Sequence, residues 1–535
     1  MAVRMTRPAG KYRGVFGVSD ARLLSPRQII NYFLMTDRRG SMKVETAESQ
    51  SFSYKGALRY ITVAAGVMGA LYLPAIIFPD TWFRVLTTVM LVALLGLTGR
   101  ALVSALFSFK RPETPELTLS DTELPDVSVV IPAYNEAAVL PDTIEACRNL
   151  DYPAEKLEVV LCYERDSVDD TAAICEEAAA DDERFKAIER DEPGGGKAKA
   201  TNYALQYATG EIIASIDADH RFKSDAIRRA VAWFESDADI WCVKGRCYGD
   251  NPRDSLLALH ATVERHIAEK GDLFAREVLG GFTIFGGGQA FFRAEMFDEL
   301  GDFDESVLVE DIDMSSKIHD FGKQLRVDPS IVTFEENPGT LQSWWSQRKR
   351  WARGWMQVAF RYLFRLPRSQ NMSMRERFDA GFTFAYALMP VYVAFTFPIL
   401  LFDMVRDFAV HNAATAPILA DMGLKTTLQY GVPTATFFSE FTRNALWTLL
   451  AVSPAIAACM VFVQDYRDGF SHDSLELFAS FTLWVYLALQ SVVYVVSFLD
   501  EVIFERPSIY VTTARVNSQA KSGSSKTGGT ETKSD

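Results

Sequence analysis

The segment EIIASIDADH, residues 211–220, joins a short apolar run to two carboxylates that are separated by one residue. The run predicts a buried strand over residues 211–217, and Asp217 and Asp219 would lie where that strand ends. Carboxylates at a strand end can hold a hard cation such as Mg²⁺ or Mn²⁺, which in turn binds two phosphate oxygens of a nucleotide. Because Asp-x-Asp also occurs by chance in many proteins, its meaning depends on the elements around it.

The region before this segment alternates short apolar runs with amphipathic stretches. We predict strands over residues 127–131, 158–163, 185–189 and 211–217, and helices over residues 136–149, 170–180 and 199–208. Such alternation requires right-handed crossovers and a mainly parallel sheet. Ligands bind such sheets beyond the carboxyl ends of the strands. The predicted fold class is therefore α/β, and the polar residues that follow the strands are candidates for a binding site.

Three polar motifs follow the earlier predicted strands. The turn PAYNE, residues 132–136, is either an ordinary strand–helix connection or part of a site. The acidic turn ERDSVDDT, residues 164–171, can contact a nucleobase or ribose, or can cap the next helix. The stretch GGGKAKATN, residues 194–202, combines glycines with two lysines that could cover a pyrophosphate, but it lacks the spacing of a P-loop.

Two further motifs lie later in the chain. The acidic pair Glu310-Asp311 follows the glycine-rich residues 286–289. The pair can supply a general base whose pKa is raised by burial beside other carboxylates, or it can lie in a solvated loop. In QRKRW, residues 347–351, an arginine beside an indole suits a diphosphate and a stacked sugar. A membrane-interface position is the alternative for the tryptophans, above all for Trp344 and Trp345.

Apolar residues are concentrated toward the two ends of the 535-residue chain. Residues 60–78 and 85–109 each approach the roughly 20 apolar residues that a bilayer requires. Basic residues flank the pair, so we expect a transmembrane hairpin with both flanks in the cytosol. Arg100 interrupts the second segment and is expected to snorkel to one face or to pair within the helix bundle. Three more apolar segments follow, at residues 382–402, 444–463 and 475–498.

The three C-terminal segments leave the topology open. Three full spans would place the C-terminus outside the cell, yet residues 505–515 are basic, as in a cytosolic tail. Either one segment does not span fully or another spans unrecognised. The candidates are residues 382–402, which contain two prolines, and residues 425–441, which could form an amphipathic element.

Composition sets further limits on the class of protein. The formal net charge of −14 argues against a nucleic-acid partner. The six cysteines show no metal-ligand spacing and are expected to be reduced, buried thiols. We predict six regions: a polar cytosolic segment (1–56), a transmembrane hairpin (57–110), a cytosolic α/β domain (120–338), interfacial amphipathic helices (339–370), a C-terminal transmembrane region (376–504) and a cytosolic, disordered tail (505–535).

Taken in order, the motifs PAYNE, the acidic turn, KATN, DAD, ED and QRKRW resemble those of family-2 inverting glycosyltransferases. The similarity is to the processive group that includes cellulose, chitin and hyaluronan synthases, and it covers about residues 127–360 and the flanking membrane layout. It implies a GT-A-type nucleotide-sugar-binding domain. It also implies transfer of a sugar, from a donor expected to be a UDP-sugar, to a growing β-linked polysaccharide with inversion and with Mg²⁺ or Mn²⁺.

The resemblance also implies roles for individual residues. Glu164 stands where the family usually has an aspartate that contacts the uracil, and Asp219 corresponds to the metal ligand beside the nucleotide-contacting Asp217. The full implied set comprises Asp311 as catalytic base and Arg350 as diphosphate-binding group; Glu164, Lys199, Asn202, Asp217 and Asp219 as nucleotide-sugar contacts; Asp219 and Asp217 at the metal; and Trp351, Gln347 and Gly287 as acceptor contacts.

Two alternative functions remain. A non-processive transferase would add one sugar to a lipid-linked acceptor, although such enzymes usually lack the Gln-x-x-Arg-Trp element. A membrane scaffold with a degenerate catalytic fold would be expected to have lost an essential charged residue. Asp217, Asp219, Asp311 and Arg350 are all present, which argues against this alternative. The transferase readings share a nucleotide-sugar donor and a lipid bilayer as partners. Each places a multi-pass protein in the cell membrane with its catalytic domain in the cytosol.

Overall fold

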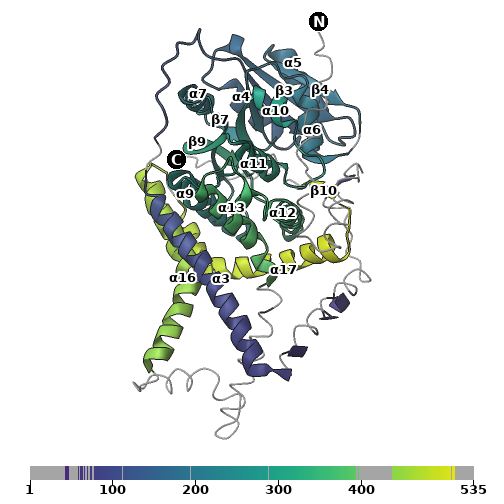
Figure 1. Cartoon of the computed structure of the whole chain (residues 1–535). Coiled ribbons are helices and arrows are strands. Elements are labelled where there is room, and N and C mark those ends of the chain that lie inside the picture. Colours follow the sequence, from purple (N-terminus) through teal and green to yellow (C-terminus); the bar gives the residue numbers. More distant parts are fainter. Residues whose placement is uncertain are drawn as a thin grey trace, which may run out of the picture.

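The structure is a computed structural model of the chain (Figure 1). It describes residues 43–46, 79–110, 113–192, 194–286, 288–392, 437–470, 472–507 and 509–512, together with residue 396 and scattered positions between 58 and 78. Gly287, most of residues 425–441, the rest of the N-terminal segment and the tail beyond residue 512 lie outside the described residues.

The central domain is built on an eight-stranded sheet with the order β4-β3-β2-β5-β8-β7-β9-β6. Its first four strands are mutually parallel and confirm the four predicted strands. They are β2 (Val127–Ala133), β3 (Leu157–Glu164), β4 (Phe185–Arg190) and β5 (Ile212–Ile216). The helices between them are α4 (Leu140–Arg148), α5 (Thr171–Asp181) and α6 (Gly196–Leu205), also as predicted.

The other half of the sheet corrects the prediction of a mainly parallel arrangement. Strand β8 (Gln289–Arg293) is antiparallel to both β5 and β7 (Ile240–Gly249). The cause is the helical connection between β7 and β8, which returns the chain to the end of the sheet where β7 stopped. Strand β9 (Gln324–Glu335) is parallel to β7, and the short β6 (Arg221–Phe222) is antiparallel to β9. The sheet is therefore mixed, in a GT-A-like α/β fold.

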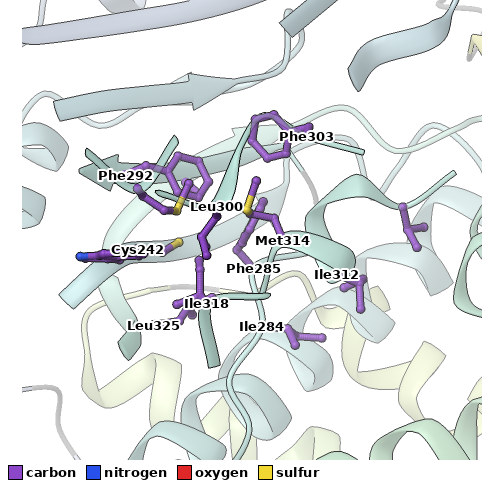
Figure 2. Close-up of a cluster of buried hydrophobic side chains, with 14 of the residues drawn as sticks. Cys242, Ile284, Phe285, Phe292, Leu300, Phe303, Ile312, Met314, Ile318 and Leu325 are labelled. Atoms are coloured by element: carbon purple, nitrogen blue, oxygen red, sulfur yellow. The ribbon is translucent and has the colours of Figure 1, made fainter. Parts of the chain in front are cut away.

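Strand side chains alternate between two apolar cores, one on each face of the sheet. Val129 packs with α4, α5 and α7 (Ala226–Ser236), whereas Val130 packs on the opposite face with α6, α10 (Ala294–Leu300) and α11 (Glu310–Phe321). Figure 2 shows part of the second core, where Phe285 meets Phe292 edge to face with ring centroids 5.0 Å apart. This core anchors the segment that carries the glycine-rich residues and the acidic pair to the sheet.

A layer of helices lies beside one end of the α/β domain. Helices α3 (Pro79–Phe107) and α16 (Phe437–Arg467) pack against each other and extend away from the domain (Figure 1). Helix α17 (Ser474–Phe498) instead runs across the base of the domain, packed on α8 (Leu256–His266) and α12 (Leu341–Tyr362). Trp344 of α12 is fully buried and donates its Nε1–H to Tyr486 of α17 at 3.0 Å, so the membrane-interface alternative is wrong for this residue.

Within the described residues, one helix, Ser474–Ile503, is long and apolar enough to cross a membrane by length and composition. Only 28% of its most apolar stretch is buried in the protein, so much of its apolar surface is exposed. A shorter apolar helical stretch covers Leu95–Phe107. The predicted segment 60–78 is described only at scattered positions, and 382–402 begins in α13 (Met374–Ala387) before leaving the described residues. The flanking transmembrane helices thus stay a prediction.

Two smaller predictions are confirmed. All six cysteines are free thiols, and five of them are buried. Arg100 is paired rather than directed to lipid, because its Nε lies 3.2 Å from Asp272 and its terminal nitrogen lies 3.2 Å from Asp379. The contact to Asp272, in the π-helical segment η5 (Ile267–Leu273), connects α3 directly to the α/β domain.

Candidate active site

A cavity of about 350 Å³ opens at the carboxyl ends of β2, β3 and β5. Its size lies in the range of sites that hold small ligands and cofactors. The turns after these strands, the first turns of α6 and α11, and one face of α12 form its walls. Seven of the predicted site residues line it: Glu164, Asp217, Asp219, Asp311, Gln347, Arg350 and Trp351.

The acidic turn after β5 lines this cavity. The backbone N–H of Asp217 donates to the carbonyl oxygen of Gly288 at 2.8 Å, so the turn is fixed to the start of β8. One ligand atom from each of Asp217, Asp219 and His220 lies within 4.8 Å of the others. The two carboxylates fit a divalent cation of the Mg²⁺ or Mn²⁺ class, with room for further oxygen ligands from a nucleotide, and the imidazole lies beside them.

Lys197, rather than the predicted Lys199, reaches this acidic cluster. Its Nζ lies 2.5 Å from Asp217 Oδ1 and 3.7 Å from Glu310 Oε1. Helix α6 begins at Gly196, and positions two residues apart on a helix point about 200° apart. Lys199 accordingly points elsewhere and pairs with Glu192 at 2.8 Å. The sequence does contain a signal for Lys197, because this lysine directly follows the glycine run at which the helix starts.

Asn202 performs a structural task in α6. Its side-chain amide donates to the carbonyl oxygen of Phe303 at 2.9 Å, and its side-chain oxygen accepts from the Phe303 backbone N–H at 3.0 Å. The side chain is buried and is not part of the cavity wall. It fastens the segment before α11, and its predicted contact with the nucleotide has no support from the cavity lining.

The acidic turn after β3 divides its two expected roles among different residues. Glu164 is buried at the cavity wall, with Oε1 2.7 Å from Arg190 Nε and Oε2 2.7 Å from a terminal nitrogen of the same guanidinium. Burial raises the pKa of Glu164, while Arg190 opposes the rise. Asp169 serves the start of α5, where its carboxylate accepts from the backbone N–H of Thr171 at 3.1 Å and from that of Ala137 at 3.0 Å.

The pair Glu310-Asp311 forms the first turn of α11, so the solvated-loop alternative is wrong. Glu310 is 8% exposed, and both residues line the cavity. Burial raises the pKa of Glu310, Lys197 opposes this, and Asp311 adds to it. Two adjacent carboxylates in a partly dry site suit proton transfer near neutral pH.

Helix α12 supplies the wall opposite the acidic cluster. Gln347, Trp351 and Trp355 recur every four residues and therefore share one face of the helix, with Arg350 beside them. The Arg348 guanidinium lies over the Trp351 ring, 4.6 Å from its centroid. This side of the cavity offers a positive charge and aromatic surface, the combination that a diphosphate and a sugar require.

The cavity lining also includes residues of two segments that contact α3. Among these residues are Asp272, Leu273 and Arg276. Asp272 is also the residue that pairs with Arg100 of α3, and Arg276 contacts Asp272 at 2.7 Å. The cavity therefore connects the acidic cluster with the base of α3.

Residues 128–301 match the sequence profile of Glycosyl transferase family 2. The chain is 30% identical over 253 residues to the probable glycosyltransferase YdaM of Bacillus subtilis, covering 46% of this chain and 60% of that protein. It is 30% identical over 279 residues to a beta-monoglucosyldiacylglycerol synthase of Nostoc sp. (51% and 57%). It is 26% identical over 252 residues to a poly-beta-1,6-N-acetyl-D-glucosamine synthase of Staphylococcus epidermidis (46% and 59%).

The matched region contains strands β2 to β8 and the part of the cavity wall that carries Glu164, Lys197, Asp217 and Asp219, whereas β9, α11 and α12 follow it. Residues 128–301 thus form a glycosyltransferase family 2 domain. The chain spans 57–60% of the length of these curated relatives.

Proposed function

We propose that the protein is a membrane-bound hexosyltransferase that transfers a sugar from a nucleotide sugar, with inversion, to a growing β-linked polysaccharide. One observation carries the proposal. Lys197, Asp217, Asp219, Asp311 and Arg350 line a single cavity at the carboxyl edge of a family 2 domain. Such a site combines groups for a diphosphate, a divalent cation and an acceptor hydroxyl.

In the proposed reaction, Asp311 accepts the proton of an acceptor hydroxyl, whose oxygen attacks C1 of the donor sugar. The bond from C1 to the diphosphate oxygen breaks on the opposite face, so the configuration at C1 inverts. Arg350 and Lys197 offset the charge that develops on the departing diphosphate. Asp219 and Asp217 would hold Mg²⁺ or Mn²⁺, which supplies further electrostatic stabilisation of the same group when it is bound.

The decisive experiment is a donor screen with the purified protein in detergent, with Mg²⁺ or Mn²⁺ present. Released nucleoside diphosphate reports transfer, and product size separates a polymer from a single addition. Asp311→Asn is expected to lower kcat by about 10²–10⁴-fold, the usual contribution of a general base. Asp298→Asn, an exposed position on α10, is the matched control. Undiminished activity of Asp311→Asn would refute the assignment of the base.

A lipid-linked acceptor is the second candidate, and the lining of the cavity favours it. The lining includes Asp272 and Arg276, next to α3, where a lipid headgroup would enter from the membrane side. A lipid glycosyltransferase is among the relatives. A product of one sugar on a lipid, with no longer species at any donor concentration, would decide for this candidate and against polymer synthesis.

A further inference from the structure

His220 directly follows Asp219 in the acidic turn after β5, and the residue is only 2% exposed. Its Nδ1 lies 3.0 Å from Asp219 Oδ1, and its Nε2 lies 3.2 Å from Glu335 Oε2. Glu335 is the last residue of β9, on the other half of the sheet. The imidazole therefore connects the predicted metal ligand with a carboxylate at a second strand end.

Glu335 is itself held firmly. Arg265 of α8 forms an ion pair with its carboxylate, and the backbone N–H of Asp250 donates to its carbonyl oxygen at 3.0 Å. The Arg265 guanidinium also lies 5.7 Å from the centroid of the Trp351 ring. Glu335 is therefore held from two other elements, and its carboxylate lies beside the imidazole.

Gly288 provides the space that this ring needs. A Cβ atom at this position would lie 2.2 Å from His220 Cε1 and 2.5 Å from each ring nitrogen, closer than any side chain can tolerate. The φ angle of Gly288 lies outside the left-handed region, so backbone conformation does not demand a glycine here. The demand comes from the imidazole, which gives this glycine of the 286–288 run a role other than contact with an acceptor.

We propose that His220 is a positioning residue, whose Nδ1–H holds the Asp219 carboxylate in the orientation that binds the divalent cation, and that Gly288 is required because the imidazole occupies its Cβ position. The proposal rests on the proposed function in one respect, which is that Asp219 is taken as a metal ligand. A hydrogen-bonded partner of a metal ligand typically contributes 10–100-fold to metal affinity.

Two substitutions distinguish the contact made by Nδ1 of the imidazole from the contact made by Nε2. In His220→Asn the side-chain amide can take the place of Nδ1–H, whereas in His220→Gln it reaches the position of Nε2. We expect Mn²⁺ affinity, measured by electron paramagnetic resonance of free Mn²⁺ with UDP present, to fall at least tenfold in His220→Gln and His220→Ala. A loss below about threefold is expected in His220→Asn and in the control His260→Asn, which lies on α8 outside the cavity.

A second readout separates positioning from general damage. At saturating Mn²⁺, kcat of the His220 variants should stay within a few-fold of wild type, and the thermal unfolding midpoint should be unchanged in His220→Asn. Equal Mn²⁺ affinity in wild type, His220→Gln and His220→Ala would overturn the proposal. So would a strong ¹⁴N coupling in the spin-echo spectrum of bound Mn²⁺, because that signal would make His220 a direct ligand.

A double-substitution cycle tests the role of Gly288. Gly288→Ala alone should lower Mn²⁺ affinity as much as His220→Ala does, and adding it to His220→Ala should cost nothing more. An equal loss in both backgrounds would overturn the steric argument. Failure of the wild-type protein to bind Mn²⁺ with any nucleotide would instead refute the metal in the proposed function, so the two failures are distinguishable.

Discussion

Replacing Lys197 by methionine removes the one ammonium that lies within 4 Å of both Asp217 and Glu310 among the described residues. When a nucleotide diphosphate is bound, this charge would face it together with Arg350. A hydrogen bond to a charged group contributes about 1.5–3 kcal/mol. Since about 1.4 kcal/mol corresponds to a tenfold change, we expect the donor KM of Lys197→Met to rise by roughly 10- to 150-fold. Lys197→Arg, which keeps the charge, should recover part of this loss.

The matched control for this variant is Lys199→Met, two residues later on the same helix. Lys199 pairs with Glu192 outside the cavity lining, so its removal should change the donor KM by less than about threefold. Initial rates with varied donor at saturating Mn²⁺ measure both variants in one assay. A larger effect of Lys199→Met than of Lys197→Met would refute the assignment of Lys197 to the donor site. It would mean that Lys199 is the lysine of α6 that faces the donor in the working enzyme.

Three further predictions concern stability and the metal. Asn202→Ala should lower the free energy of unfolding by about 1–3 kcal/mol for each Phe303 backbone group left unpaired, whereas a raised donor KM at unchanged stability would indicate a nucleotide contact. Burial alone would lower the pKa of His472, but hydrogen bonds to Asp465 and Glu476 raise it to about 9. The protonated His472 contributes of order 2–3 kcal/mol to the free energy of unfolding, and this contribution is present below pH 6.5 and lost as the pH rises through 9. The thermal unfolding midpoint should therefore fall over this pH range in wild type and not in His472→Gln. EDTA should abolish transfer and added Mn²⁺ or Mg²⁺ should restore it, and full activity in EDTA would remove the cation from the mechanism.

The first half of the sheet could be predicted because each of its strands can be recognised from its own residues and those next to it in the sequence. Strands β2 to β5 are short apolar runs, each bounded by polar turns and followed by an amphipathic helix. Strand β7 gives no such signal, since its sequence IWCVKGRCYG contains two charges. Lys244 and Arg246 are nevertheless buried, because Lys244 pairs with Glu269 and Arg246 pairs with Asp465. These partners lie 25 and 219 residues away, a separation that no periodicity can reveal.

The candidate site, like the sheet, could be predicted only where the sequence motifs themselves carry the information. The resemblance of the ordered motifs to a known family implied that Asp217, Asp311 and Arg350 serve one site, and all three line one cavity. The resemblance implied Lys199 through the KATN motif, whereas the lysine that reaches the acidic cluster is Lys197, in the first turn of α6. The contacts of His220 needed the register of β9, and β9 was not among the predicted strands.

Asp272 takes part in two features of the molecule. It lines the cavity, and it is the counter-ion of Arg100 in α3. In a fragment that begins after α3, Asp272 and Arg276 would face solvent where this helix had covered them. Such a fragment could keep its donor site intact and still select its acceptor differently. Acceptor specificity measured on a truncated domain should for this reason not be transferred to the full chain.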